Sequence, residues 1–466
     1  MLFDKNEILE ALSGQIIDHD IADFNINEIT IDSRKAVKNT AFIAIKGEIN
    51  DGNQFAKNAL ENGCELAIID NQEIFQQLKD GQSNLILVKN SFESLYDLAK
   101  YQRSQTKAKI IALTGSVGKT SVKDMLKSAF EKIGKTHATS SNFNNHYGLP
   151  LTMCNISKDD KFVILEIGMS NPGEIKPLSI LAKPDIAIIT NIAKAHIGNG
   201  FNSEDDIALE KSEILSGLNE SGTIILNKDD KYCDFLQNIA IENNIPLESI
   251  ISFGKDHNAN YKLSEINIKS HDLSDVAVQT DSKIMHYEIA TSNQVTILNS
   301  TIVTACLDIV TQNINPALES FKEFKASTGR TNIIKTDKFT IIDDSYNANL
   351  TSSKAGIQYL CDLKKQIKAP RSVAFIGDML ELGEHSDQDH QKLIKFCQEK
   401  NIDKIIPIGS EMQKAVKNLC IDLKTYLNCN EVANEISKIL QSGDLIIVKG
   451  SRGMRLERII EILKNL

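Results

Sequence analysis

The residues best suited to chemistry in this 466-residue chain form a glycine-rich segment that ends in Lys-Thr. Residues 114–121 are TGSVGKTS, between an apolar run typical of a buried strand (109–113) and a run typical of a helix (122–134). Glycines let backbone N–H groups turn toward an anion, and the helix N-terminus adds its positive dipole end. A glycine-rich turn without a ligand is the simpler alternative, but strand, loop and helix occur together here. The pattern predicts a phosphate-binding loop with these nucleotide contacts: Thr114, Gly115, Ser116, Val117, Gly118, Lys119 and Thr120.

Two loop side chains and a carboxylate further along the chain suit a magnesium nucleotide. Lys119 is expected to reach the β- and γ-phosphates, and the Thr120 hydroxyl to bind Mg²⁺. Glu166 is the polar residue near the end of an apolar run, 162–167. Mg²⁺ prefers oxygen ligands, and strand ends beside such a loop are where ligands bind. The sequence thus predicts ATP and Mg²⁺ as cofactors, with Glu166 as a metal ligand rather than a solvent-facing strand end.

A histidine and a lysine after the loop are ambiguous by themselves. His196 follows the apolar run 185–192, and Lys211 lies in a helical run, 205–215. A single histidine is more often a surface or core residue than a metal ligand, and a helix lysine more often forms surface ion pairs. Both alternatives stay open at this point.

These residues need a scaffold, and the central region of the chain, 91–316, has the pattern of one. It opens with a helical run, 91–105, and continues with strand-like apolar runs at 109–115, 162–168, 185–192 and 222–227, each followed by a helical segment. This alternation predicts βαβ units and a mostly parallel sheet. Residues 260–297 alternate polar and apolar residues, which predicts a small antiparallel excursion.

Two further regions flank the central one. Residues 1–90 mix short strands with a helix near 54–62, and residues 317–466 repeat the βαβ rhythm with strand-like runs at 339–345, 372–378, 404–410 and 444–450. We therefore predict an α/β protein of three domains. They are a small N-terminal α/β domain (1–90), a central parallel-sheet domain with the phosphate loop (91–316) and a C-terminal Rossmann-like domain (317–466).

Composition limits the classes of function. Hydrophobic residues make up 41% and charged residues 24% of the chain, which is ordinary for a soluble globular protein. The net charge of −10 argues against a nucleic-acid or anionic-membrane binder, since both need a basic surface. No apolar run approaches the ~20 residues of a membrane span, and no export signal is visible. The eight cysteines are scattered without a CxxC pair, so we expect reduced thiols in a cytoplasmic protein.

The short loop TGSxGKT, with two residues between Gly115 and Gly118, resembles the ATP loop of the Mur ligase family, which builds the peptide of bacterial peptidoglycan. In that family, a histidine after a TNI-like strand and a lysine in an EKxEI helix complete the metal site. His196 and Lys211 stand at the matching positions. The resemblance implies that Lys211 is carbamylated by CO₂. It also implies that Thr120 and Glu166 bind the nucleotide Mg²⁺ and that Glu166, His196 and Lys211 bind a second metal ion. The last three are expected to act in catalysis with Lys119.

Other stretches resemble the branch of this family that adds D-alanyl-D-alanine to a UDP-linked muramoyl tripeptide. They are SNFNNHYGLP (141–150), IDDSYNAN (342–349), GDMLELGEHS (377–386) and VKGSRGMR (448–455). In the N-terminal region, DSR (32–34), FIAIKG (42–47) and DG (51–52) resemble a uridine-diphosphate-binding domain. The resemblance implies substrate contacts at Ser33, Arg34, Lys46, Asn142, Asn144 and Asn145, and further ATP contacts at Asn299, Arg330, Asp344 and Asn347.

The resemblance implies an ATP-dependent peptide ligase that works through an acyl phosphate. Its partners would be the muramoyl tripeptide nucleotide and D-alanyl-D-alanine, without nucleic acid, and we expect a monomer. Three alternatives stay open: another Mur ligase, a folylpolyglutamate synthetase-like ligase, or a non-catalytic ATP-binding partner protein. The chain departs from the family at Asn53, at Leu350 and at Val295-Thr296, where the family has a His-Asn pair that helps to hold adenosine. We expect the nucleotide contact to differ there.

Overall fold

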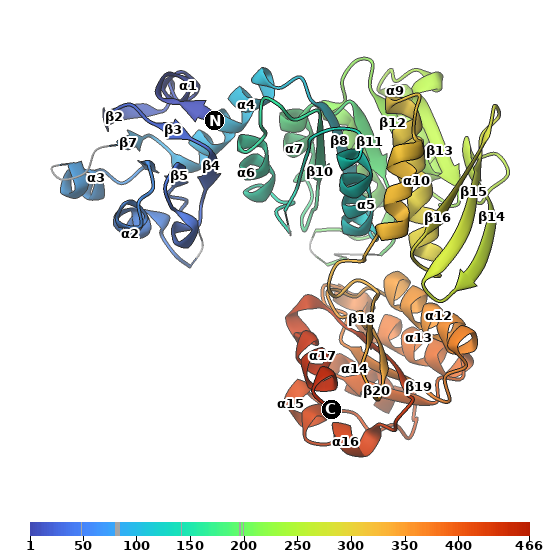
Figure 1. Cartoon of the computed structure of the whole chain (residues 1–466). Helices are drawn as coiled ribbons and strands as arrows, with labels where there is room; N and C mark the ends of the chain where they lie inside the picture. The colour runs from blue at the N-terminus through green and yellow to red at the C-terminus, as the bar shows by residue number, and fades with distance from the viewer. Residues whose placement is uncertain (48, 80–83, 141, 195–196, 199) are drawn as a thin grey trace.

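Three α/β units make up the protein in a computed structural model, which describes residues 1–47, 49–79, 84–140, 142–194, 197–198 and 200–466. In Figure 1 the N-terminal and central units lie side by side, and the C-terminal unit lies beneath the central one. The predicted fold class, α/β with three domains, is confirmed.

A sheet of nine strands forms the central unit, in the order β16-β15-β14-β13-β12-β11-β8-β10-β9. The strands from β9 to β14 run parallel, and β14, β15 and β16 form an antiparallel extension. The mostly parallel sheet predicted from the apolar runs is therefore present. The strands are β8 (Lys109–Thr114), β9 (Thr136–Ala138), β10 (Phe162–Glu166), β11 (Ile186–Ile189), β12 (Thr223–Asn227), β13 (Ile250–Gly254), β14 (Tyr261–Ser270), β15 (Leu273–Gln279) and β16 (Ile284–Ile289).

Both faces of this sheet are covered, which explains why its strands have no polar alternation. In β8, Ile110 and Ala112 pack in a core shared with the N-terminal unit, whereas Ile111 and Leu113 pack under α5 and α10. Successive strand residues point to opposite faces, so β8 is buried from both sides. The helices are α4 (Ser91–Gln105), α5 (Lys119–Glu131), α6 (Gly148–Cys154), α7 (Ile175–Ala182), α8 (Glu204–Ser212), α9 (Cys233–Glu242), α10 (Gln294–Val310) and α11 (Asn315–Leu318).

The antiparallel extension ends earlier than the alternating pattern predicted. β16 ends at Ile289 and α10 begins at Gln294, so the prediction was wrong for the last residues of 260–297. The Asn293 side chain accepts hydrogen bonds from the N–H groups of Val295 and Thr296. Such a cap satisfies two backbone donors that the first helical turn leaves free, and it starts the helix at this point.

The N-terminal unit is built on a five-stranded sheet, in the order β2-β7-β6-β5-β4. Strands β4 to β7 run parallel and β2 runs antiparallel to β7. The helix predicted near 54–62 is present as α2. The elements are β1 (Phe3–Asp4), α1 (Lys5–Ala11), β2 (Ile16–Asp20), β3 (Asn25–Ile26), β4 (Glu28–Thr30), β5 (Thr40–Ile43), α2 (Ala56–Glu61), β6 (Leu66–Ile69), α3 (Gln72–Lys79) and β7 (Leu85–Val88).

Asn155 joins the N-terminal sheet to the central unit. Its side-chain oxygen accepts a hydrogen bond from the Ile29 N–H at 2.8 Å, and its Nδ2 donates to the Ile29 carbonyl at 2.9 Å. Ile29 belongs to β4, the last strand in the order of that sheet, so the amide takes the place of a further strand. A single apolar core extends from this unit into the central sheet. Hydrogen bonds and shared core together fix the two units to each other.

The C-terminal unit has the predicted Rossmann-like pattern. Its sheet has the order β17-β18-β21-β19-β20, with β17 antiparallel and the other strands parallel. Separate apolar clusters cover its two faces. The elements are β17 (Asn332–Lys335), β18 (Thr340–Asp344), α12 (Leu350–Ile367), β19 (Ser372–Gly377), α13 (Ser386–Glu399), β20 (Lys404–Ile408), α14 (Ser410–Asn418), α15 (Cys429–Ala433), α16 (Ile436–Ile439), β21 (Leu445–Lys449) and α17 (Glu457–Lys464).

The exact domain boundaries remain predictions. Phe321 and Phe324 pack in the core beneath α5 and α10, so the chain is still part of the central unit after residue 317. We propose that the second boundary lies after Phe324. The first boundary, at 90/91, falls just before α4, whose Leu95 and Leu98 contribute to the core shared by both units.

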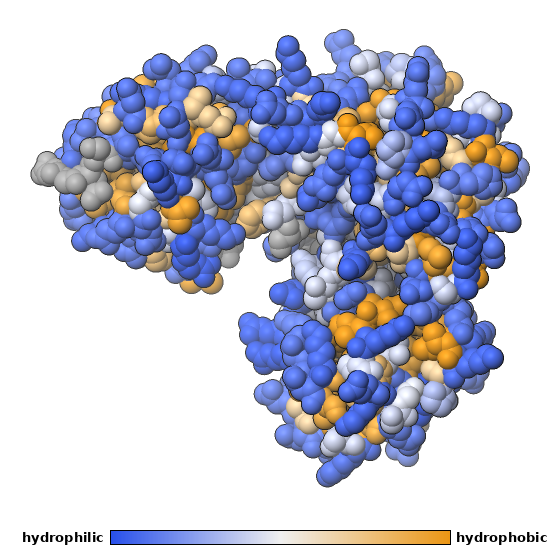
Figure 2. All heavy atoms as spheres, in the orientation of Figure 1, coloured by the Kyte–Doolittle hydropathy of each residue, from blue (hydrophilic) through white to orange (hydrophobic). Residues whose placement is uncertain are grey.

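The face of the molecule seen in Figure 2 is mainly hydrophilic. Figure 2 shows hydrophilic residues over most of the visible face, with hydrophobic residues in scattered groups. Within the described part of the chain, none of the helices is both long and apolar enough to cross a lipid bilayer.

The junction at Asn155 gives a test of this architecture. Asn155→Ala leaves the buried N–H and carbonyl of Ile29 without their partners, which costs about 1–3 kcal/mol. We expect a lower midpoint of thermal unfolding. Asn243→Ala is the matched control, because the exposed Asn243 amide donates to the Ile239 carbonyl of its own helix and joins no two units. Equal unfolding midpoints for the two variants would show that the Asn155 hydrogen bonds do not stabilise the contact between the two units.

Candidate active site

The glycine-rich loop between β8 and α5 has a backbone that only glycine adopts easily. Gly115 and Gly118 have φ angles of +149° and +86°. A Cβ on Gly115 would lie 1.9 Å from the Thr190 Oγ1 atom, and one on Gly118 would lie 3.0 Å from the Asn299 Nδ2 atom. Both glycines are therefore required by backbone conformation and by the close approach of Thr190, which follows β11, and of Asn299 in α10.

Lys119 and Thr120 open the helix after this loop, where backbone N–H groups have no partner within the helix. The Lys119 ammonium donates to the Gly115 carbonyl at 2.7 Å, which folds the side chain back over the loop. Burial lowers the pKa of Lys119, the Glu166 carboxylate raises it, and Arg330 lowers it further. Thr114 ends β8, and its buried hydroxyl has no hydrogen-bond partner among the described residues.

Glu166 carries a carboxylate oxygen that is buried without a partner among the described residues. The residue ends β10 beside β8 and is 2% exposed. Its Oε1 accepts a hydrogen bond from Asn144 Nδ2 at 2.8 Å, whereas Oε2 has none. A buried carboxylate oxygen without a donor is costly, unless a cation or a ligand completes it.

Lys211 is a buried lysine without a carboxylate at ion-pair distance among the described residues. It lies in α8, is 2% exposed, and has its Nζ 3.8 Å from the Met169 sulfur. Burial lowers its pKa well below the usual value, the positive charge of Lys119 lowers it further, and Glu210 raises it. The carboxylate of Glu210 instead accepts hydrogen bonds from the N–H groups of Gly173 and Ile175, at the start of α7. The surroundings favour a neutral Lys211 amine.

The fourth predicted metal ligand, His196, lies outside the described residues. Among the residues that are described, no three His, Cys, Asp or Glu side chains gather as a metal site. Of the predicted metal ligands, the Glu166 Oε2 atom and the Thr120 hydroxyl are the described oxygen atoms that could bind a metal ion. This set fits Mg²⁺, which commonly binds one or two carboxylates and completes its shell with water and substrate phosphates.

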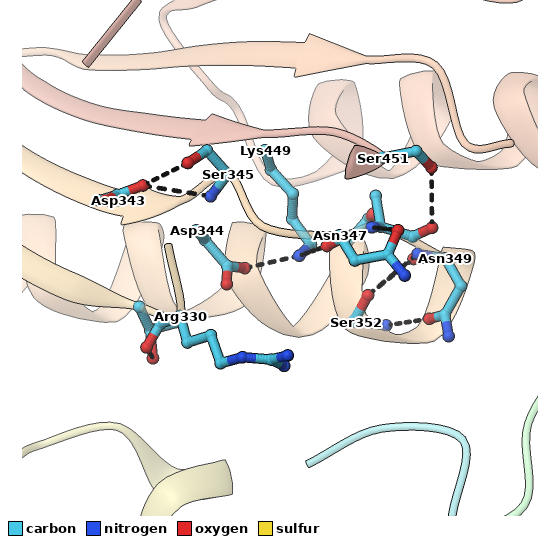
Figure 3. Close-up of polar contacts among 12 residues, drawn as sticks. Arg330, Asp343, Asp344, Ser345, Asn347, Asn349, Ser352, Lys449 and Ser451 are labelled. Carbon is cyan, nitrogen blue, oxygen red and sulfur yellow. Dashed lines mark hydrogen bonds and ion pairs between the residues drawn. The ribbon is translucent and has the colours of Figure 1, made fainter. Parts of the chain in front are cut away.

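The phosphate loop lines a cleft, and the C-terminal unit supplies the opposite wall. Figure 3 shows the Lys449 ammonium between Asp344 and Asn347, at 2.7 Å from the Asp344 carboxylate and 3.0 Å from the Asn347 carbonyl. Burial raises the pKa of Asp344, and Lys449 opposes this effect. The Arg330 guanidinium lies over the Tyr346 ring, 4.2 Å from its centroid. Asn299, Arg330, Asp344 and Asn347 all line one cleft of about 380 Å³ with the phosphate loop.

The segment at 142–145 lines the same cleft, and its asparagines differ in what they do. Asn144 orients Glu166. The Asn145 side chain accepts hydrogen bonds from the N–H groups of Tyr147 and Gly148, which starts α6, so its oxygen is already engaged. Asn142 also lines the cleft.

Of the residues predicted to bind uridine diphosphate, two line a groove and one does not. Ser33 and Arg34 line a groove of the N-terminal unit that Tyr147 of the central unit closes at one side. Arg34 pairs with Asp32 at 2.8 Å and leaves 87% of its side chain exposed. Lys46 is exposed, pairs through its backbone with Asp51, and is not among the residues that line this groove.

The departure at Val295-Thr296 falls inside the cleft. Both residues line it, in the first turn of α10, and Val295 is 42% exposed. An apolar side chain thus lies at this wall, where the resemblance implied a polar one. Asn53 and Leu350 lie elsewhere: Asn53 bonds to Asp51 and Asp70, and Leu350 begins α12.

Asn191 is a residue that sequence reasoning missed. Its Oδ1 accepts from the Val117 N–H at 2.9 Å, its Nδ2 donates to the Val117 carbonyl at 3.1 Å, and its own carbonyl accepts from the Ser116 N–H at 3.0 Å. Thr190 adds a hydroxyl bond to the Val117 carbonyl at 2.7 Å. The end of β11 therefore holds the middle of the phosphate loop. A polar pair directly after a buried strand was the one available indication.

Known proteins resemble the chain along its whole length. Family models described as "Mur ligase family, catalytic domain", "Mur ligase middle domain" and "Mur ligase, glutamate ligase domain" match residues 25–103, 113–307 and 329–452. The UDP-N-acetylmuramoyl-tripeptide–D-alanyl-D-alanine ligase of Rickettsia prowazekii is 32% identical over 94% of this chain and 95% of its own length. That of Bacillus subtilis is 30% identical over 98% and 97%. A crystal structure of MurF from Acinetobacter baumannii has a TM-score of 0.86 at 27% identity and covers 99% of this chain and 98% of its own.

The contacts of Asn191 predict a positioning role. Asn191→Ala removes two hydrogen bonds to Val117, each worth about 0.5–1.5 kcal/mol, so ATP should bind roughly tenfold more weakly in titration calorimetry. Asn219→Ala is the matched control, since that amide bonds to Asp185 at the other end of β11. If both variants bind ATP as the unaltered protein does, the loop does not need this support.

Proposed function

Because the chain belongs to the Mur ligase family, we propose that it is an ATP-dependent ligase that joins D-alanyl-D-alanine to a UDP-linked muramoyl tripeptide. The main support for this proposal is that Lys119 and Glu166 of the central unit line one cleft together with Arg330 of the C-terminal unit. The names of the relatives that match over nearly the full length favour it over another Mur ligase, a folylpolyglutamate synthetase-like ligase or a non-catalytic partner.

The first step brings two anions together. An oxygen of the tripeptide's terminal carboxylate attacks the γ-phosphorus of ATP, the bond from that phosphorus to the β–γ bridging oxygen breaks, and ADP leaves with the electron pair. Lys119 and Arg330 are placed to balance the negative charge spread over the transferring phosphoryl group. The phosphate loop orients this group through the free N–H groups at the start of α5.

The second step forms the amide. The amine of D-alanyl-D-alanine attacks the carbonyl carbon of the acyl phosphate and loses a proton, and the tetrahedral intermediate expels phosphate. Phosphate keeps the oxygen that came from the tripeptide carboxylate. Water would destroy the acyl phosphate, so a cleft walled by both units has a second purpose, which is to exclude it.

Magnesium belongs to this proposal: Thr120 and Glu166 would hold the nucleotide Mg²⁺, and Glu166, His196 and a carbamylated Lys211 would hold a second ion. When bound, Mg²⁺ supplies positive charge beside the phosphates. Burial, the absence of a carboxylate partner among the described residues, and the lowered pKa of Lys211 support a neutral amine that can react with CO₂. The carbamate would give α8 an anionic oxygen ligand in place of an ammonium that repels the metal.

The nucleotide end of the tripeptide substrate is proposed to bind in the N-terminal groove. The segment 142–148 supports this arrangement, because Asn144 contacts Glu166 at one end and Tyr147 lines the groove at the other. Ser33 and Arg34 are the proposed contacts, with Lys46 near the groove. We further propose a monomer and, since both ATP and a nucleotide-linked precursor are needed, a cytoplasmic location.

The proposed function is tested by phosphate release. The protein with ATP, Mg²⁺, UDP-muramoyl tripeptide and D-alanyl-D-alanine should release phosphate and form the pentapeptide nucleotide. Omission of either peptide substrate should stop turnover. Phosphate release that depends on a different acceptor, or on none, would contradict the proposal.

Lys119→Ala is expected to lower the ligation rate at least about 100-fold, because a preorganised charge at the phosphoryl group is lost. The thermal midpoint should change little. Lys127→Ala, on the surface of the same helix and paired with Glu131, is the matched control and should ligate normally. Near-normal ligation by Lys119→Ala would remove the phosphate loop from the chemistry.

Lys211→Ala is expected to lose ligation and to keep ATP binding, because Lys119 and Thr120 remain. Ligation by the unaltered protein should fall when CO₂ and bicarbonate are removed and return when they are restored. With ¹³C-bicarbonate, a carbamate resonance should appear in the NMR spectrum and be absent from Lys211→Ala. Full ligation by Lys211→Ala would show that the lysine is only a buried structural residue.

A further inference from the structure

The acceptor dipeptide brings a carboxylate to the cleft, and a cation must bind it. Three cations line the cleft in the described part of the chain. Lys119 folds over the phosphate loop, Lys449 is engaged by Asp344 and Asn347, and Arg330 lies at the phosphoryl wall. Each therefore has a task that does not involve the acceptor.

Arg452 is a further cation at the edge of this cleft. Its guanidinium carbon lies 5.4 Å from the centroid of the Tyr346 ring, the ring that Arg330 contacts at 4.2 Å. Its side chain is 63% exposed, and among the described residues its nearest carboxylate oxygen, on Glu457, lies 3.7 Å from its Nη1 atom. That distance is too long for a hydrogen bond, so the planar donor fork of Arg452 remains available for a carboxylate.

The backbone before Arg452 is held where three stretches meet. The Ser451 hydroxyl donates to the Ala348 carbonyl at 3.3 Å and accepts from the Leu380 N–H at 2.8 Å. The Ser451 N–H donates to the Asp378 carbonyl at 3.0 Å. Figure 3 shows the Ser451 contact beside Asn347 and Asn349. The stretches 342–349, 377–386 and 448–455, which are distant in sequence, thus converge on the residue that precedes Arg452.

An apolar side chain lies against the residue that follows Arg452. Leu380 is 43% exposed, and a Cβ on Gly453 would lie 2.8 Å from its Cδ1 atom. Leu380 therefore covers the residue next to Arg452. A cation one residue away from an exposed aliphatic side chain suits a small amino acid with a free carboxylate and a methyl side chain.

We propose that Arg452 binds the terminal carboxylate of D-alanyl-D-alanine and that Leu380 contacts its last methyl group. This subsite rests on the proposed function. An extended dipeptide spans about 7 Å. A carboxylate held at Arg452 therefore leaves the amine within reach of the wall formed by Tyr346 and Arg330, where the acyl phosphate forms. The subsite selects acceptors that end in a free carboxylate one residue beyond the attacking amine.

The test is a double cycle that combines a change in the protein, Arg452→Ala, with a change in the acceptor, from the acid to its C-terminal amide. With Arg452→Ala, the KM for D-alanyl-D-alanine should rise at least about tenfold, because a charge-assisted bidentate contact is lost. The KM values for ATP and for the tripeptide nucleotide should stay within about twofold. Arg452→Lys should recover part of the loss. Arg458→Ala, an exposed arginine in α17, is the matched control and should behave as the unaltered protein.

The C-terminal amide of the dipeptide completes the cycle. The unaltered protein should use the amide at least about tenfold less well than the acid, and Arg452→Ala should use both about equally. Equal use of acid and amide by the unaltered protein would overturn the subsite, and this result does not depend on whether the variant folds. An unchanged KM in a folded Arg452→Ala would do the same. Failure of the unaltered protein to ligate D-alanyl-D-alanine at all would instead overturn the proposed function.

Discussion

The phosphate loop must hold one shape against an anion, and much of the architecture follows from this constraint. Gly115 and Gly118 permit the shape, β8 and α5 fix its two ends, and the end of β11 fixes its middle through Asn191. In the sheet, β8 lies between β10 and β11. The carboxyl ends of three neighbouring parallel strands therefore bring loop, Glu166 and Asn191 to one edge, which is where α/β sheets bind ligands.

Charge in the cleft is unbalanced in a way that ligands would correct. Lys211 is buried, and both its burial and the positive charge of Lys119 lower its pKa. Glu166 has a buried oxygen without a donor among the described residues. Buried polar groups without partners cost free energy, so a bound ligand that pairs with these groups would stabilise the site. We propose that phosphate and a metal ion supply the missing charges, and that CO₂ converts the neutral Lys211 amine into an anionic carbamate. The C-terminal unit adds Arg330 and the pair Asp344–Lys449 at the opposite wall.

The sequence predicted best what depends on local pattern. The strands of the central sheet were visible because burial on both faces makes them continuous apolar runs, and the loop was visible because strand, glycines and helix are adjacent. Residues 294–297 were misassigned, since alternation continues by chance into a helix that Asn293 caps. Asn191 and the convergence on Ser451 were missed because they depend on contacts between segments far apart in the chain. No periodicity in a single sequence encodes such contacts.

We propose that the tripeptide carboxylate is activated in this cleft as an acyl phosphate. It is tested most directly with a tripeptide nucleotide whose terminal carboxylate carries ¹⁸O at both oxygens. One of these oxygens stays in the amide, and the other leaves with phosphate. Mass spectrometry of the released phosphate should find one ¹⁸O atom in each molecule formed during ligation. Phosphate without ¹⁸O, released together with the normal pentapeptide product, would contradict the account.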